Sequence, residues 1–176
     1  MKRTLALFTL FAIASLAAAC DRSPTPPKPE AKHSDPLIHP KDEALMDRAV
    51  AKARATQAQF VTALQSKGTR YRGFAIKKPF PVTGDATEGE HMWINEVTWD
   101  GKKFSGVVNN DAVKTKAVAL GDHVTVTPEE LSDWMYIDHG NLVGGYTLRV
   151  LHFESSPEEQ AKFTEETGIK VPPIDF

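Results

Sequence analysis

The chain has 176 residues, with 21 lysines and arginines against 23 aspartates and glutamates, which gives a formal net charge of −2. No basic block stands out, and this argues against a nucleic-acid role. The length suits one domain, and the single cysteine leaves an ordinary hydrophobic core, not a disulfide, to stabilise it.

Residues 1–19 are predicted to be an export signal. Lys2 and Arg3 form a positive start, and residues 5–19 form an uncharged apolar run that is too short for an ordinary membrane span. Cys20 follows directly, which resembles the lipid-acceptor cysteine of a bacterial lipoprotein signal, although Ala17 stands where leucine is usual. We therefore predict that Cys20 carries lipid. The alternative is ordinary cleavage after an Ala-x-Ala site, which would leave a free thiol.

Residues 20–40 are predicted to be a tether, because six prolines in the twenty residues after Cys20 favour extended backbone and prevent burial of apolar surface. Such a segment can hold a folded domain up to ~60 Å from a membrane. Asp21 resembles the inner-membrane retention signal of enterobacterial lipoproteins. The expected location is the periplasmic side of a membrane, with the inner membrane favoured.

A long helix is predicted from Lys41 to Lys67, since apolar side chains recur there at helical spacing, with Gln57 as the interruption. The alanines of this stripe indicate close packing against a sheet. The stripe consists of Leu45, Ala49, Ala53, Phe60 and Leu64.

From Tyr71 onward the pattern changes to alternating strands with turn signals between them. Gly144-Gly145 is interpreted as a bulge or a close backbone approach, because no helix is expected after it. A polar helix from Pro157 to Thr167 is expected to be capped by Ser156. The expected strands are Arg72 to Phe80, His91 to Trp99, Phe104 to Val108, His123 to Thr127, Trp134 to Ile137 and Leu142 to Phe153, with a single helical turn at Pro128 to Glu130.

These elements predict an α+β fold, with a twisted antiparallel sheet of about six strands packed against the long N-terminal helix and a short C-terminal helix. Residues 41–156 are expected to form the single domain, and residues 157–176 the C-terminal helix and tail.

Two stretches, "HMWINEVTWDGKKFSGVVNN" and "ALGDHVTVTPEELSDWMYIDHGNLVGGYTLRVL", resemble the bacterial domain of unknown function 2314. The resemblance covers about Ala44 to Phe153 and implies fold boundaries but no activity. The residues that carry it are His91 and Trp93, Gly121 and Asp122, Ser132 to Tyr136, and Gly145 to Arg149.

Catalytic and metal patterns are weak in this sequence. There is no Gly-x-Ser-x-Gly elbow, and the strand-region histidines stand singly, without the paired spacing of a zinc site, so neither a metal nor a cofactor is expected. A pair of carboxylates on one edge would be needed for acid–base hydrolysis. The histidines are His91, His123, His139 and His152, and the candidate acids are Glu88, Glu90, Asp133 and Asp138.

Arg149 is expected on an otherwise apolar strand, where its charge needs a partner. A structural ion pair with Glu96, Asp133 or Asp138 is favoured over a ligand anion. The aromatic residues of the strand region are expected to form mainly cross-strand pairs. The candidate ligand-binding residues are Arg149, Tyr146, Trp134, Asp133, His91 and Trp93.

The sequence favours a membrane-anchored envelope lipoprotein that acts as a non-enzymatic binding module for an envelope protein or cell-wall partner. One alternative is an immunity-type protein that neutralises a periplasmic toxin. The other is a hydrolase that uses Asp133, Asp138, His91 or Arg149, which requires the acids to lie together in a cleft with a raised carboxyl pKa.

Overall fold

The computed structural model describes residues 40–66 and 70–176, with the side chains of residues 85–88 excepted. The predicted export signal, Cys20 and all of the predicted tether before Pro40 lie outside the described residues. No helix in the described part of the chain is long and apolar enough to cross a membrane.

The long helix α1 (Glu43–Gln65) is confirmed. It begins after Asp42, whose carboxylate accepts the main-chain N–H of Leu45 at 2.9 Å and so satisfies one of the free donors of the first turn. Ala63, and not the neighbouring Leu64, is the last fully buried residue of its apolar stripe. The full buried stripe is Leu45, Ala49, Ala53, Phe60 and Ala63.

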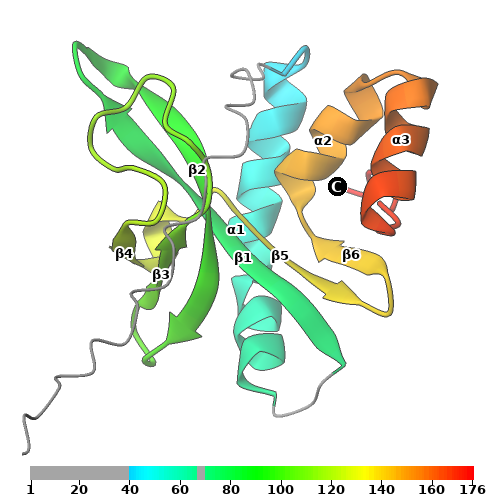
Figure 1. The fold of residues 1–176 in the computed structure, drawn as a ribbon, viewed down its shortest axis with the longest axis horizontal. Helices are drawn as coiled ribbons and strands as arrows, with labels where there is room; N and C mark the ends of the chain where they lie inside the picture. Colours follow the sequence, from blue (N-terminus) through cyan, green and yellow to red (C-terminus); the bar gives the residue numbers. More distant parts are fainter. Residues whose placement is uncertain (1–39, 67–69) are drawn as a thin grey trace, which may run out of the picture.

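Six antiparallel strands form one sheet in the order β4-β3-β2-β1-β5-β6, and α1 packs across one of its faces (Figure 1). The fold is therefore α+β, as predicted. The strands are β1 (Tyr71–Val82), β2 (Asp85–Trp99), β3 (Phe104–Val108), β4 (His123–Val126), β5 (Asp133–Asp138) and β6 (Asn141–Gly144), with a 3-10 turn η1 (Pro128–Glu130) before β5.

The core lies between α1 and the sheet. Trp134 is fully buried there, and its indole N–H donates to the carbonyl of Ala53 on α1 at 2.8 Å. Its ring centre lies 5.6 Å from that of Phe60, so one aromatic contact joins the middle of the helix to the middle of the sheet. The largest other fully buried side chains are Phe104, Ile76, Met92, Ile94 and Leu131.

The predicted strand from Leu142 to Phe153 is wrong, because the chain leaves the sheet after Gly144 and forms a helix, α2 (Tyr146–Glu154). Gly144 and Gly145 have φ values of 71° and 61°, which other residues rarely adopt. A Cβ on Gly144 would lie 2.5 Å from Cε3 of Trp134, so the expected close backbone approach does occur here. The expectation that no helix follows it is wrong.

The chain ends with α3 (Pro157–Thr167) and a short tail. Ser156 caps α3 in a capping box with Glu159, as its sequence predicts. The tail then returns to the sheet: the N–H of Leu142 donates to the carbonyl of Lys170 at 2.9 Å, and Lys170 forms an isolated parallel bridge with Asn141. The tail therefore covers part of the outer edge of β6, whereas β4 ends the sheet on the other side.

Candidate functional site

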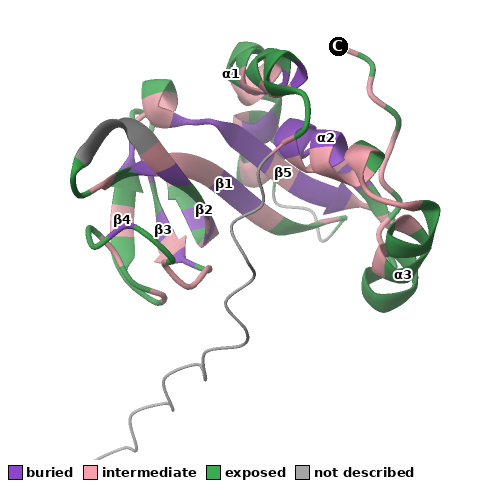
Figure 2. Ribbon diagram, turned by 90° about the horizontal axis from the view of Figure 1, so that it is seen from above, coloured by how far each residue is buried: buried purple, intermediate pink, exposed green. Residues whose placement is uncertain are grey.

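The sheet face that points away from α1, here called the open face, is more exposed than the face that packs on the helix. On β2, Met92 and Ile94 are buried, whereas His91, Trp93 and Asn95 are partly or fully exposed. In Figure 2, α1 and α2 lie on one side of the sheet, and no described helix covers β1 to β4 on the other. The open face carries Lys77, His91, Trp93, Asn95, Ser105, Val107, His123 and Thr125.

Trp93, Lys77 and Asp133 form one row across three neighbouring strands. Lys77 on β1 pairs with Trp93 of β2 on one side and with Asp133 of β5 on the other. Directly paired residues of antiparallel strands put their side chains on the same face. The ammonium of Lys77 lies 5.3 Å from the centre of a Trp93 ring, which is a cation–π contact.

Lys77 is partly exposed, and its ammonium has few partners among the described residues. Its Nζ donates to the hydroxyl of Thr147 at 3.3 Å, and it forms no ion pair with another described residue. Burial lowers the pKa of Lys77 below its ordinary value, and the charge of Asp133 opposes this shift. Because an ammonium has three N–H donors, two of them are not used by the described residues.

Asp133 is fully buried and caps α2 from a distant part of the chain. Its Oδ1 accepts the N–H groups of Trp134 and Tyr146 at 2.8 and 3.1 Å, and its Oδ2 accepts the N–H and the hydroxyl of Thr147 at 2.8 and 2.7 Å. Burial raises the pKa of Asp133, and these hydrogen bonds and the charge of Lys77 act against that rise. The carboxylate of Asp133 acts as the N-terminal cap of α2. Gly145, which occupies the N-cap position, has no side chain that could accept these N–H groups.

His91 lies beside this row and contacts Ser132. Its Nδ1 is 2.9 Å from the hydroxyl oxygen of Ser132, a residue that is only 1% exposed. Among the described contacts Nδ1 is the acceptor that the Ser132 hydroxyl can use, so we assign the proton of the neutral ring to Nε2. Although the residue as a whole is exposed, partial desolvation of the ring, together with the charges of Lys77 and Arg54, lowers the pKa of His91 to about 4.

Trp134 and Tyr146, two further candidate residues, lie on the side of α1 and are used in packing. Their rings meet edge to face with centres 5.7 Å apart, and the Tyr146 hydroxyl lies 3.1 Å from that of Thr56 on α1. The open face therefore gathers His91, Trp93 and Asp133 from the predicted set, but not these two aromatic residues.

Arg149 is buried on α2 and bound to groups other than those predicted. Its Nε donates to the carbonyl of Gly144 at 2.9 Å, and its Nη1 lies 3.1 Å from the carboxylate of Asp175. The guanidinium also lies 4.9 Å from the ring centre of Tyr146. The expected partners Glu96, Asp133 and Asp138 are wrong, because the helix and the returning tail bring Asp175 to this site.

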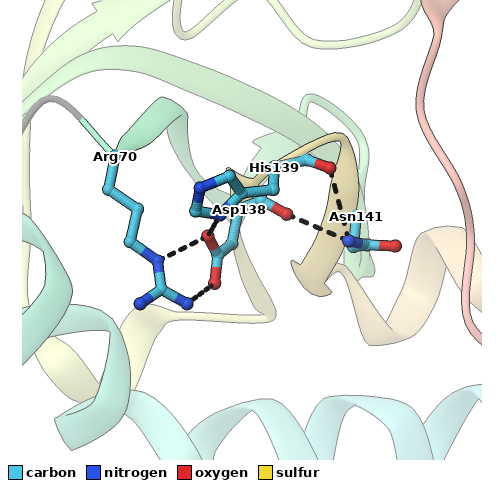
Figure 3. Close-up of polar contacts among 4 residues, drawn as sticks. All are labelled: Arg70, Asp138, His139 and Asn141. Carbon is cyan, nitrogen blue, oxygen red and sulfur yellow. Dashed lines mark hydrogen bonds and ion pairs between the residues drawn. The ribbon is translucent and has the colours of Figure 1, made fainter.

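Asp138, at the other end of β5 from Asp133, belongs to a separate surface network (Figure 3). Arg70 binds both of its carboxylate oxygens, at 2.7 and 2.5 Å, and Nδ1 of His139 lies 2.6 Å from Oδ1. Hydrogen bonding to Arg70 is the main cause that lowers the pKa of Asp138 to about 2. A residue this acidic at an exposed ion pair is a poor proton donor at neutral pH.

The carboxylate of Glu90 is likewise used in hydrogen bonds to main-chain N–H groups. Its carboxylate accepts the N–H groups of Val113, Lys114 and Thr115 at 2.8, 2.8 and 2.7 Å, which fixes the connection between β3 and β4. The side chain of the fourth candidate acid, Glu88, lies outside the described part of the structure. The described acids Glu90, Asp133 and Asp138 each serve a different contact and do not form a pair with one another. Within the described part of the chain, no three metal-ligating side chains are grouped so that they could hold a metal ion.

A groove of about 420 Å³ lies between α1 and the sheet, away from the open face. Tyr71 and Tyr136 form one wall, with ring centres 5.0 Å apart. Burial raises the pKa of Tyr136, and a hydrogen bond with Gln59 of the opposite wall acts to lower it. The full lining is Ala58, Gln59, Thr62, Ala63, Tyr71 and Tyr136.

Sequence reasoning missed Lys77, Ser132 and Thr147 as members of the open-face cluster. The sequence did indicate where Lys77 points. Phe74, Ile76 and Phe80 lie on one face of the predicted strand, and Lys77 lies on the other face, directed away from the core. Thr147 had none, because its position depends on the start of α2 beside Asp133.

Comparisons with known proteins identify a bacterial family, and the names that they give state no activity. The model of a family described as "Uncharacterized protein conserved in bacteria (DUF2314)" matches residues 42–171. The "Uncharacterized protein YegJ" of Escherichia coli K12 is 32% identical over 120 residues, which cover 68% of this chain and 74% of that protein.

A second relative is named "Putative ankyrin repeat protein" and comes from Neisseria meningitidis serogroup B. It is 34% identical over 95 residues, which cover 53% of this chain. The match spans 38% of the length of that protein, so most of the Neisseria protein lies outside the similarity. No solved structure matches the chain.

Proposed function

This chain belongs to the DUF2314 family of uncharacterised proteins conserved in bacteria, and from that premise we propose that it is a lipid-anchored envelope protein whose open face binds a partner protein without catalysing a reaction. The single observation that carries the binding proposal is the row of Trp93, Lys77 and Asp133, in which the lysine keeps unused donors beside an accessible tryptophan.

The anchor is supported by the sequence alone. Lys2 and Arg3, the apolar residues 5–19 and Cys20 follow the order of a lipoprotein signal, and the proline-rich residues up to Pro40 would separate the domain from the membrane. The domain begins almost directly after this segment, at Asp42. Lipid on Cys20 would therefore hold the open face within reach of other envelope proteins.

The absence of catalysis is supported by how the reactive groups are used. The hydroxyl of Ser132 is buried, so a substrate would reach it only after the fold opens. Asp133 accepts four hydrogen bonds, and Asp138 is held by Arg70, so neither carboxylate is available as an acid or base. The hydrolase alternative needs these two acids in one cleft, and they stand at opposite ends of β5.

A crosslinking experiment in living cells tests the binding surface. A photoreactive amino acid is placed at Thr125, which is exposed on the open face, and in a matched variant at Ala55, which is exposed on α1. We expect one discrete crosslinked product from Thr125 and none from Ala55. Products from Ala55 alone, or none from Thr125, would rule out the open face as the binding surface.

The anchor is tested separately by Cys20→Ser. This variant is expected to leave the membrane fraction and appear in the soluble periplasmic fraction with an unchanged thermal transition, because Cys20 lies outside the folded domain. A variant that stays in the membrane fraction would contradict lipid attachment and favour an uncleaved signal as the anchor.

A further inference from the structure

We propose that Lys77, His91 and Trp93 bind the side-chain carboxylate of an acidic residue on the partner protein. The inference rests on the proposed function, because it assumes that the open face is the binding surface. It adds the chemistry of the contact: two N–H donors for the carboxylate and an aromatic surface for the aliphatic part of the same side chain.

The donors come from two neighbouring strands. Lys77 on β1 directs its ammonium toward the ring of Trp93 and uses one of its three donors on Thr147. His91 precedes Trp93 by two residues on β2, so both side chains lie on the open face. With Nδ1 engaged by Ser132, the Nε2–H of the exposed His91 ring is a second donor. A carboxylate accepts several such bonds at once.

Lys77 and Arg54 bring two positive charges to the cluster against the one carboxylate of the buried Asp133, so the balance of charge favours an anion. Asp133 is the nearest acid in the row, and both of its oxygens are taken by the start of α2 and by Thr147. None of the described carboxylates lies within ion-pair distance of Lys77, and Arg54 adds a second positive charge that acts on His91. The neighbouring Lys78 differs, because it pairs with Glu130 on the other side of the sheet.

The shape of the site favours a side chain presented by a protein over a free small molecule. Small-molecule sites are concave and enclose most of the ligand. The groove of about 420 Å³ lies on the α1 side, and its lining includes none of the three residues of this cluster. On the open face, His91 is exposed, and Lys77 and Trp93 are each partly exposed, on a sheet surface that no described helix covers (Figure 2). An aspartate or glutamate on a protein surface can reach such a site.

Direct binding of defined peptides tests the proposal with the full-length protein in neutral detergent. The first probe is an acetylated and amidated peptide of alternating alanine and glutamate, whose carboxylates are all on side chains. The second replaces glutamate by glutamine, and the third is an acetylated alanine peptide with a free C-terminal carboxylate. We expect the glutamate peptide to bind at least about tenfold more tightly than the other two, the factor that one charge-assisted contact supplies.

Variants of adjacent lysines provide the control. Lys77→Met is expected to weaken binding of the glutamate peptide about tenfold, and Lys77→Arg to restore part of it. Lys78→Met removes the same charge from the other side of the sheet and should change binding less than about twofold. Carbodiimide, which joins a lysine amine to a touching carboxylate as an amide, should couple the peptide to Lys77.

Equal binding by wild type and Lys77→Met, or coupling only at other lysines, would overturn the proposal. Tighter binding of the peptide with the free terminus would overturn the assignment to a side chain. If crosslinking from Thr125 fails while the glutamate peptide still requires Lys77, the partner-binding function is wrong and the carboxylate site stands. If crosslinking succeeds and Lys77→Met has no effect on the peptide, only the carboxylate site is wrong.

Discussion

The carboxylate of Asp133 accepts the main-chain N–H of Thr147 at 2.8 Å, so a residue of β5 caps a helix that starts at Tyr146, thirteen positions later in the chain. Replacing Asp133 by alanine removes this cap and leaves buried N–H groups without acceptors. We expect Asp133→Ala to lower the free energy of unfolding by about 2–4 kcal/mol. Chemical denaturation followed by circular dichroism measures the change.

Thr147→Val is the matched control for that prediction. It removes the hydroxyl that Asp133 and Lys77 share but keeps the N–H that donates to Asp133. The expected loss is about 1 kcal/mol, the typical worth of one hydrogen bond. An Asp133→Ala variant that is no less stable than Thr147→Val would show that the capping role is wrong.

Gly144 is expected to tolerate no side chain. Its φ is 71°, and a Cβ would run into the carbonyl and the ring of the buried Trp134. Gly144→Ala should therefore lower the free energy of unfolding by about 3 kcal/mol or more, since backbone strain and overpacking add. Gly121→Ala is the control, because Gly121 has φ 88° and no atom within 4 Å of the added Cβ. It should cost about 1–2 kcal/mol, and equal effects on the denaturation midpoint would contradict the clash.

Arg149 and Asp175 are expected to contribute unequally although they form one ion pair. Arg149 is buried and holds the carbonyl of Gly144, so Arg149→Met should lower the free energy of unfolding by about 2–3 kcal/mol. The side chain of Asp175 is 70% exposed, so Asp175→Asn should cost less than about 1 kcal/mol. Thermal melts of the two variants make the comparison, and a larger loss for Asp175→Asn would mean that the tail contact dominates.

His91 is expected to make the fold less stable in mild acid. Its pKa is about 4 in the folded protein against an ordinary value of 6.5, so between these values the unfolded chain binds more protons. The contribution to stability is complete above pH 6.5 and is lost as the pH falls toward 4. Melting temperatures measured between pH 7 and 4 should fall less steeply for His91→Gln than for wild type. An unchanged slope in His91→Gln would refute the prediction.

Local patterns predicted most of the fold, and the largest error came from a contact that is distant in sequence. α1, β3, η1 and α3 were recognisable because their apolar periodicity, turn residues and caps lie within the elements themselves. The helix α2 has Gly145 at its cap position, and its capping group is Asp133, twelve residues earlier. Leu142, Tyr146, Leu148 and Val150 also alternate like a strand, so nothing local marked the change.

The sequence likewise predicted only the part of the candidate site that depends on local patterns. His91, Trp93 and Asp133 were identified from the resemblance and from strand alternation, and the strand pairing brings them together. Arg149 was recognised as a charge that needs a partner, but Asp175 lies in a tail that no periodic pattern connects to α2. Lys77 could have been found from strand alternation, because Phe74, Ile76 and Phe80 share the core-facing side of the predicted strand and Lys77 lies on the opposite side.

The two edges of the sheet are not equivalent, and this limits how copies of the protein can join. Lys170 occupies part of the outer edge of β6, whereas the outer edge of β4 pairs with no described strand. A sheet that can grow at one end only can pair with one other sheet, edge to edge, through β4 of each copy. Such pairing uses both available edges and stops at two molecules. The short returning tail thus favours a closed pair of molecules over open-ended growth from sheet to sheet.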